Sequence, residues 1–293
     1  SSVAKAIKLI DTFGENIILR HQSDWISGWF LKDWSYGEES NNLKLGWNTA
    51  NKSWPESFDS FSLKKSLPLI IKSGSIFGKI NQSIANLLGT NEHLLLISGT
   101  TDSNAAFIAA QVKENEGLTI LGTTIVLKKI IKKTFNHPGI TMHKVNGDLI
   151  CGGSSNAGCG VLSNFFSDLE IEELSQQINP RKKTALNYLP LNSQGERFPT
   201  NDPFLKPIIK PRPVSDALFL QGLLEGLARI ELKGWLKLKS FTGYLPKKII
   251  TIGGGSKNPQ WKSIREKTLK IPIKNSNKST SFGSALIALQ ADS

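Results

Sequence analysis

The sequence predicts an α/β protein with two domains, and three observations support this class. Its 293 residues are more than one compact hydrophobic core usually organises. The order of an apolar strand, a turn of small residues and a helix occurs twice, in residues 93–112 and 247–269. A polar stretch, KENEG at 113–117, interrupts the chain between them. We therefore expect a first domain over residues 1–115 and a second over 116–293.

The first hundred residues predict helices and short strands. The segment 24–32 (DWISGWFLK) is amphipathic and aromatic-rich, which indicates a helix packed in the core. Trp54 and Pro55 open another helical segment, because proline is tolerated in a first helical turn. Five of the seven tryptophans lie at or before Trp54. Since tryptophan usually supplies buried bulk, we expect these five in the core of the first domain.

The next segments predict a strand, a turn, a helix and a hairpin. A strand over 93–98 leads into the turn GTTDSN, and a helix follows over 105–112. Residues 118–127 (LTILGTTIVL) form two apolar runs that meet at Gly122 and Thr123. This pattern is typical of a hairpin with a glycine and a hydroxyl at its tip.

The remainder of the second domain combines a long loop with helices and a strand. Residues 190–213 hold six prolines and predict a surface loop. Residues 216–236 form the longest helical stretch, in which Glu225 is expected to be an ordinary helix residue unless it is buried. The last strand, turn and helix span 247–269 around the glycine-rich turn GGGSKN. Such a turn presents backbone N–H groups and a helix N-terminus, which together suit an anion.

Composition narrows the class of protein further. Hydrophobic residues make up 39% and charged residues 20%, as in globular proteins, and no apolar run approaches the ~18 residues that span a bilayer. The first residues lack the features of a secretory signal. Two cysteines, Cys151 and Cys159, are too few for a disulfide framework and indicate reduced thiols in a cytoplasmic protein. The four histidines show no metal-ligand spacing with them, so no protein metal site is expected.

The formal net charge of +12 raises the question of an acidic partner. Basic surfaces attract nucleic acid, but the lysines are scattered and no nucleic-acid motif accompanies them. We expect no specific nucleic-acid binding. A small phosphorylated ligand would be attracted by the same charge.

The motifs exclude several enzyme classes and leave one carboxylate in an informative place. The sequence has no P-loop, no dinucleotide-binding fingerprint and no nucleophile elbow. What remains is three turns of small residues, one of which carries Asp102. Phosphoryl transfer depends largely on positioning and charge stabilisation, and an aspartate can take the proton of the attacking hydroxyl. Aspartate is also a preferred helix cap, so Asp102 has a catalytic and a structural interpretation at this point.

Six motifs in register give a stronger indication. SGTTDSNAAFIAA, LGTTIVLKK, CGGSSNAGCGVL, GERFP, LLEGLARIE and GGGSKNPQW resemble the FGGY family of carbohydrate kinases, over nearly the whole chain. Within it they look most like the D-xylulose or D-ribulose (pentulose) kinase branch of cyanobacteria and plants. HQSDWISGWF and NNLKLGWNTANKSWP resemble first-domain signatures of that branch. The resemblance implies two ribonuclease-H-like domains of the actin and hexokinase type.

The resemblance also implies roles for individual residues. Asp102 matches the catalytic base that activates the terminal hydroxyl of the sugar, and Thr101 and Ser103 flank it as substrate contacts. Glu196 and Arg197 match a loop with a structural role. The residues that match the nucleotide site are Gly122, Thr123, Gly158, Gly254, Gly255, Ser256 and Asn258. ATP and Mg²⁺ are the implied cofactors, and Mg²⁺ would take most of its ligands from phosphate oxygens and water.

One departure from the family pattern limits these implications. The family opens with a hairpin carrying Asp-x-Gly-Thr, and nothing like it is present before Ser1. The chain thus resembles the rear part of a kinase with its first domain truncated, which predicts exposed apolar surface or unpaired strand edges there. Because the first sugar-binding loops of the family are also missing, the identity of the sugar stays open. The alternatives are a non-catalytic nucleotide-binding remnant of the kinase fold and a general polyanion binder.

Overall fold

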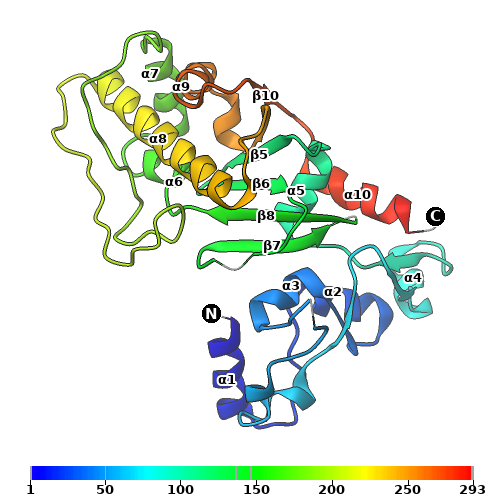
Figure 1. The fold of residues 1–293 in the computed structure, drawn as a ribbon. Helices are drawn as coiled ribbons and strands as arrows, with labels where there is room; N and C mark the ends of the chain where they lie inside the picture. The colour runs from blue at the N-terminus through cyan, green and yellow to red at the C-terminus, as the bar shows by residue number, and fades with distance from the viewer. Residues whose placement is uncertain (1, 50, 136, 146, 292–293) are drawn as a thin grey trace. The chain divides into compact units, whose positions relative to one another are not determined.

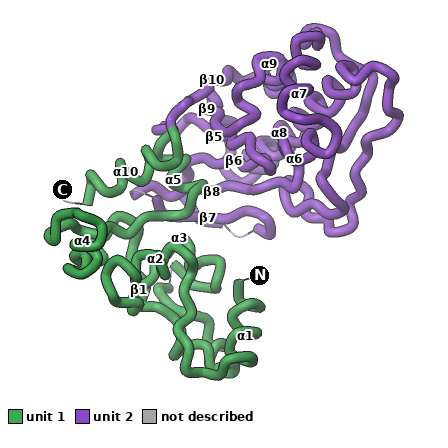
Figure 2. Tube along the Cα trace, turned by 180° about the vertical axis from the view of Figure 1, so that it is seen from behind, with its two compact units in different colours: residues 1–109, 279–293 green, residues 110–278 purple. Residues whose placement is uncertain are grey.

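The chain forms two compact units in a computed structural model that describes residues 2–49, 51–135, 137–145 and 147–291. Unit 1 consists of residues 1–109 together with 279–293, and unit 2 consists of residues 110–278 (Figure 2). The expected domain boundary followed residue 115 and assigned the end of the chain to the second domain. The compact units instead divide before residue 110, and the last helix groups with unit 1.

Unit 2 is built on a six-stranded mixed sheet (Figure 1). The strand order is β10-β9-β5-β6-β8-β7, with β10, β9 and β5 parallel and the other neighbours antiparallel. The strands are β5 (Glu116–Leu121), β6 (Ile125–Ile130), β7 (Ile140–Val145), β8 (Asp148–Ser154), β9 (Lys248–Ile252) and β10 (Ile273–Asn275). The hairpin expected over 118–127 is therefore present as β5 and β6.

One long helix of unit 2 packs on this sheet and defines the core. In this helix, α8 (Asp216–Thr242), Trp235 packs so closely on Gly117 of β5 that a Cβ there would lie 2.4 Å from its ring. Gly234 packs on Leu127 of β6 in the same way, at 2.6 Å. Leu127 and Trp235 belong to one large apolar cluster. The helices of unit 2 are α6 (Cys159–Leu162), α7 (Asp168–Gln176), α8 (Asp216–Thr242), the 3₁₀ turn η4 (Gly254–Lys257) and α9 (Pro259–Leu269).

Of two further expectations for this half of the chain, the loop is present, but Glu225 is not the ordinary helix residue expected. Residues 190–213 form a loop whose only described strand-like features are isolated bridges such as Leu189–Ile208. Glu225 of α8 is buried, and its carboxylate accepts hydrogen bonds from the backbone N–H and hydroxyl of Thr184 at 3.0 and 2.7 Å. It therefore anchors the segment before that loop to the helix.

Unit 1 combines short helices with two separate pairs of strands. Its strands are β1 (Tyr36–Glu38), β2 (Leu69–Ile71), β3 (Ile76–Lys79) and β4 (Leu95–Ile97), of which β1 and β2 are parallel and β3 and β4 antiparallel. Its helices are α1 (Ser2–Phe13), α2 (Gln22–Leu31), α3 (Glu39–Asn42), α4 (Gln82–Leu88), α5 (Asp102–Ala110) and α10 (Thr280–Gln290). The 3₁₀ turns are η1 (Leu43–Leu45), η2 (Glu56–Phe58) and η3 (Lys64–Ser66).

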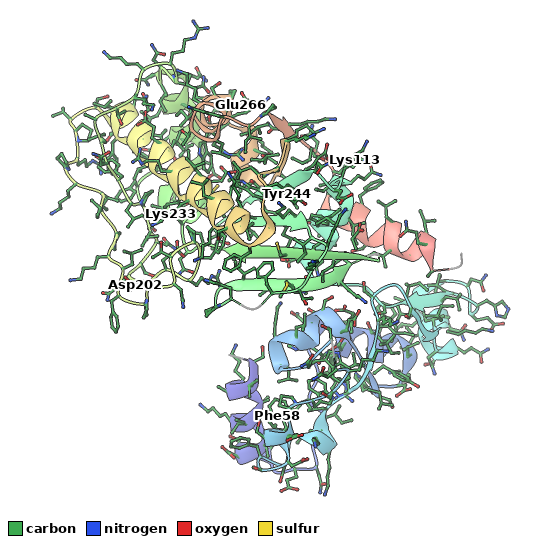
Figure 3. All side chains as sticks on the ribbon, viewed as in Figure 1. Phe58, Lys113, Asp202, Lys233, Tyr244 and Glu266 are labelled. Carbon is green, nitrogen blue, oxygen red and sulfur yellow. The ribbon has the colours of Figure 1, made fainter. Side chains whose placement is uncertain are left out.

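The expectation that the early tryptophans form the core of unit 1 is wrong. Trp25 is 55% exposed, and the other four are only half-buried. The helix expected over 24–32 is present as α2, yet the residues it buries are Asp24 and Gly28. The helical segment expected after Pro55 is only the 3₁₀ turn η2, whose Phe58 (labelled in Figure 3) supplies the buried ring.

Unit 1 exposes a series of large apolar side chains. Leu69 of β2 is 66% exposed and Leu87 of α4 is 71% exposed, and Phe13 and Ile18 are similarly accessible. Among the described residues, β2 pairs only with β1, so one edge of this strand is unpaired. These features agree with the exposed apolar surface and unpaired strand edge expected for this part of the chain.

Two simpler expectations can also be compared with the structure. Cys151, which lies in strand β8, and Cys159 are both free thiols, as expected. Among the helices that the structure describes, none combines the length and apolar character needed to cross a lipid bilayer.

Candidate active site

Asp102 is the first residue of α5, directly after the turn that follows β4. The carbonyl of Thr101 accepts the N–H groups of Asn104 and Ala105 at 3.0 and 2.9 Å, which starts the helix. The Asp102 side chain is exposed, and its Oδ1 accepts the N–H of Ser103 at 2.7 Å. The carboxylate thus binds a free donor of the first helical turn, but it is the first helical residue and bonds the next N–H, whereas a capping side chain precedes the helix and bonds the N–H two or three residues on. Because it remains exposed, it is also accessible to a substrate.

The two neighbours of Asp102 differ in accessibility. The Thr101 side chain is buried, whereas Ser103 is partly exposed. Of the two residues expected to contact substrate, Ser103 is therefore the better placed. Glycine at position 99 leaves open space above the turn, because a Cβ there would have no described atom within 4 Å.

In unit 2, the tip of the β5–β6 hairpin interlocks with the segment that leads into α6. The N–H of Cys159 donates to the carbonyl of Gly122 at 2.8 Å, and the N–H of Gly160 donates to that of Thr123 at 3.2 Å. A side chain at Gly158 would overlap the backbone of Thr123 and Thr124. Gly158 is thus required for this close approach, and these contacts join two of the predicted nucleotide-binding segments.

The glycine-rich turn after β9 lies against the same hairpin. A Cβ at Gly253 would lie 2.5 Å from the carbonyl oxygen of Leu121, the last residue of β5. A Cβ at Gly255 would lie 2.9 Å from the Cys159 sulfur and 3.0 Å from Cβ of Leu121. The structure therefore brings together, within unit 2, the three segments that sequence analysis assigned to the nucleotide. Burial raises the pKa of Cys159, so its thiol stays protonated near neutral pH.

The polar residues of this turn support its own shape. The buried Ser256 hydroxyl donates to the carbonyl of Gly253 at 2.6 Å. Asn258 caps α9, because its Oδ1 accepts the N–H of Trp261 at 2.9 Å and its Nδ2 donates to the Ser175 hydroxyl at 2.7 Å. Both side chains thus hold the turn in place within unit 2.

The four glycines predicted to contact the nucleotide separate into two groups. Gly158 and Gly255 are packed against neighbouring atoms. At Gly254 a Cβ would have no described atom within 4 Å, and at Gly122 the nearest would be the Thr124 carbonyl at 3.8 Å. Gly122 and Gly254 therefore expose backbone that a ligand can approach, and the other two shape the fold behind it.

Glu196 and Arg197 support the segment before α6. The buried Glu196 carboxylate accepts the Ser155 hydroxyl at 2.5 Å and the N–H of Asn156 at 2.8 Å. The Arg197 guanidinium donates to the carbonyl and hydroxyl of Ser154, both at 2.8 Å. These contacts fit the structural role that the resemblance implies.

A buried polar cluster in unit 1 was not anticipated from the sequence. Asp24 of α2 accepts the N–H of Glu38 and the Nδ2 of Asn42, both at 2.9 Å, and all three residues are buried. Burial raises the pKa of Glu38 to about 7, although hydrogen bonds from Ser40 and Asn41 partly oppose it. Burial also raises the pKa of Asp24 and lowers that of His21. Nothing in the amphipathic pattern distinguishes these groups from solvated ones.

The structure also contains an open pocket of about 630 Å³ away from the predicted site residues. It lies in unit 2, and Lys233 of α8 (labelled in Figure 3) is among the residues that line it. Its other lining residues are His137, Pro138, Pro199, Thr200, Asn201, Leu236, Lys237 and Ser240. None of the predicted site residues contributes to it. In the part of the chain that the structure describes, no three or more His, Cys, Asp or Glu side chains gather as a protein metal site would need.

No protein-family model matches the chain. Among curated proteins it is similar to a xylulose kinase of Staphylococcus epidermidis, with 26% identity over 263 residues, which cover 83% of this chain and 52% of the relative. The chain therefore spans about half the length of the curated relatives it matches.

Solved structures define the class of fold. The xylulose kinase of Brucella ovis superimposes with a TM-score of 0.84 at 20% identity. The glycerol kinase of Plasmodium falciparum, solved with ADP, superimposes with a TM-score of 0.83 at 18% identity. Each match covers 99% of this chain and 63% of the other. The expected fold class is confirmed, because the chain has the α/β fold of the sugar kinases.

Proposed function

We propose that the protein is a carbohydrate kinase that transfers a phosphoryl group from ATP to the terminal hydroxyl of a pentulose, D-xylulose or D-ribulose. The observation that carries this proposal is the meeting, at the end of β5 in unit 2, of the hairpin tip at Gly122, the segment at Gly158 and the glycine-rich turn after β9. The sugar-kinase fold and the similarity to xylulose kinases support the reaction class. The motifs that resemble the FGGY pentulose branch support the sugar.

Unit 2 would bind the nucleotide. Backbone near Gly122 and Thr123 would contact the phosphates, and the Gly254–Gly255 turn would lie against the adenosine, since exposed glycine backbone allows close approach. Gly158, Ser256 and Asn258 would act by holding these segments in place. ATP would carry its own Mg²⁺, which is bound in most such reactions by phosphate oxygens and water. The ion would neutralise charge on the transferred group.

Unit 1 would supply the sugar site and the base. Asp102 would accept the proton of the attacking hydroxyl, for which an exposed carboxylate at the end of a structured turn is suited. Ser103 is the partly exposed neighbour and Thr101 the buried one, so a direct sugar contact is proposed for Ser103. The cytoplasm, where both ATP and sugars occur, is the proposed location.

The decisive experiment replaces the base in the full-length protein. Asp102→Asn is expected to abolish nearly all sugar-dependent consumption of ATP while ADP binding, measured by calorimetry, is retained. Asp11→Asn, an exposed aspartate of α1, is the matched control and should leave both unchanged. Unchanged turnover in Asp102→Asn would contradict the assignment. If the wild-type protein binds ADP but phosphorylates neither pentulose, the non-catalytic nucleotide-binding alternative replaces the kinase.

A further inference from the structure

The buried polar cluster of unit 1 is centred on the short helix α3. Asp24, Glu38, Ser40 and Asn42 are each 2% exposed or less. The Glu38 carboxylate caps α3 by accepting the Ser40 N–H at 2.7 Å. Asn42 connects the Asp24 carboxylate to the Glu38 carbonyl, at 2.9 and 2.8 Å. Each polar group in such a network restrains the next, so the cluster fixes the position of α3.

One hydroxyl connects this cluster to the turn that carries Asp102. The Thr100 hydroxyl donates to the Ser40 hydroxyl at 3.2 Å. The same Thr100 oxygen accepts the Nδ2 of Asn104, also at 3.2 Å, and Asn104 is a fully buried residue of α5. Thr100 thus lies between a rigid buried element and the first turn of the helix that begins with Asp102.

Before the turn that carries Asp102, the end of β4 is held by backbone hydrogen bonds. The N–H and carbonyl of Ser98 bond to the Ser75 carbonyl and the Gly74 N–H, at 2.8 and 2.7 Å. These bonds fix the end of β4, but Gly99 follows with open space around it. Between Ser98 and the helix, the Thr100 hydroxyl is therefore the side-chain contact that restrains the turn toward α3.

We infer that Ser40 is a positioning residue that acts through the Thr100 hydroxyl to hold Asp102 in its reactive position. This inference rests on the proposed function. A catalytic group must be held within a fraction of an ångström by residues whose own positions are fixed. The α3 cluster supplies such a support, and a displacement of about 1 Å can lower a rate about 100-fold.

The test uses four variants of the full-length protein. Thr100→Val and Ser40→Ala each remove one side of the contact, and each is expected to lower kcat between about 10-fold and 100-fold with KM for ATP unchanged. Thr100→Ser keeps the hydroxyl and should retain wild-type kcat. The double variant Ser40→Ala/Thr100→Val should lose no more than Thr100→Val alone, because both changes remove the same interaction.

Thr90→Val and Ser60→Ala, at exposed positions of the same unit, are the matched controls. Hydrogen exchange at the Asn104 and Ala105 amides gives a readout that does not depend on activity. Exchange should accelerate in Thr100→Val and remain slow in Thr100→Ser. Wild-type kcat in Thr100→Val, losses that add in the double variant, or unchanged exchange would each overturn the inference. Retained turnover in Asp102→Asn would instead reject the proposed function. In that case, hydrogen exchange at the Asn104 and Ala105 amides would still decide whether Thr100 holds the turn.

Discussion

Arg265 of α9 and Glu231 of α8 form an ion pair in which each side chain is only 1% exposed. The guanidinium donates from Nε to Oε2 at 2.6 Å and from Nη2 to Oε1 at 2.8 Å. Thr119 of β5 donates to the same carboxylate at 2.6 Å, and Thr251 of β9 accepts from Arg265 at 3.0 Å. The pair therefore joins two helices to the adjacent parallel strands β5 and β9, which lead into two of the proposed nucleotide turns.

Arg265→Met should destabilise unit 2 strongly. The change leaves the Glu231 carboxylate buried without its cation, which typically costs about 3–5 kcal/mol. Urea-induced unfolding of wild type and variant measures this loss. Arg212→Met is the matched control, since Arg212 pairs with Asp216 where both side chains are about half exposed, and such pairs contribute about 0–1 kcal/mol. Equal losses in the two variants would contradict the role given to the buried pair.

Replacement of the adjacent Gly254 and Gly255 by alanine should separate an effect on nucleotide binding from an effect on the stability of the fold. Gly255→Ala places a Cβ into the Trp261 ring and the Cys159 sulfur, so it should lower the free energy of unfolding by about 1–3 kcal/mol. Gly254→Ala places its Cβ in open space and should leave the melting temperature unchanged. It should nevertheless weaken ADP binding, measured by calorimetry, if adenosine lies against this backbone. Wild-type affinity in Gly254→Ala would remove that residue from the proposed site.

Glu38 should make the folding stability of unit 1 fall as the pH rises toward 7. Its folded pKa of about 7 lies above its ordinary value of 4.5. A carboxyl with a raised pKa stabilises the fold below the unfolded pKa, and this contribution is lost as the pH rises through the folded value. Between pH 5 and 8 the wild-type protein should therefore lose stability relative to Glu38→Gln, by about 1.4 kcal/mol for each pKa unit of the difference.

Urea unfolding followed by tryptophan fluorescence is a suitable measurement, because five of the seven tryptophans lie in residues 25–54 of unit 1. The quantity to compare is the difference in stability between wild type and Glu38→Gln, since the raised pKa of Asp24 and the lowered pKa of His21 are common to both proteins. Glu15→Gln, an exposed glutamate of the same unit, should follow the wild type at every pH. Parallel curves for wild type and Glu38→Gln would show that Glu38 does not titrate in this range.

The exposed apolar side chains of unit 1 should promote self-association. Leu69 lies on the strand β2, whose outer edge is unpaired among the described residues, and such edges recruit further chains. Replacement of Leu69 and Leu87 by lysine should lower the apparent mass in sedimentation at high concentration. Leu169→Lys, at a 73% exposed position on α7 of unit 2, is the control and should have no such effect. A monomeric wild-type protein over the whole range would contradict this expectation.

Elements with local signals were the ones that sequence analysis could predict. The helix over 259–269 begins at a proline that follows the capping Asn258, and its bounds agree with the structure. The hairpin carrying Gly122 and Thr123 has two apolar runs on either side of a glycine, which is also a local signal. The hairpin tip, the segment at Gly158 and the glycine-rich turn after β9 could be assigned to one site only through the resemblance. Their meeting depends on the order of strands in the sheet, which no local signal predicts.

Features that depend on distant partners could not be predicted in this way. Asp24 lies in an amphipathic helix, and its burial depends on donors at Glu38 and Asn42 that no periodicity connects to it. Trp25, in the same helix, is exposed and belongs to neither of the apolar clusters around Leu63 and Ile84. The assignment of α10 to unit 1 depends on the contact of Gly283 with the backbone of α5.

That contact has a consequence for how the protein is made. A side chain at Gly283 would overlap the carbonyl of Ala105, so α10 and α5 lie backbone to backbone, with all of unit 2 between them in the sequence. During synthesis the N-terminal residues leave the ribosome first. The helix that begins with Asp102 therefore emerges before α10 exists and can pack against it only after residues 110–278 have been made. A nascent chain halted at residue 278 would contain the whole of unit 2 and a unit 1 that still lacks α10, so the helix that carries the proposed base would gain this packing partner only after unit 2 is made.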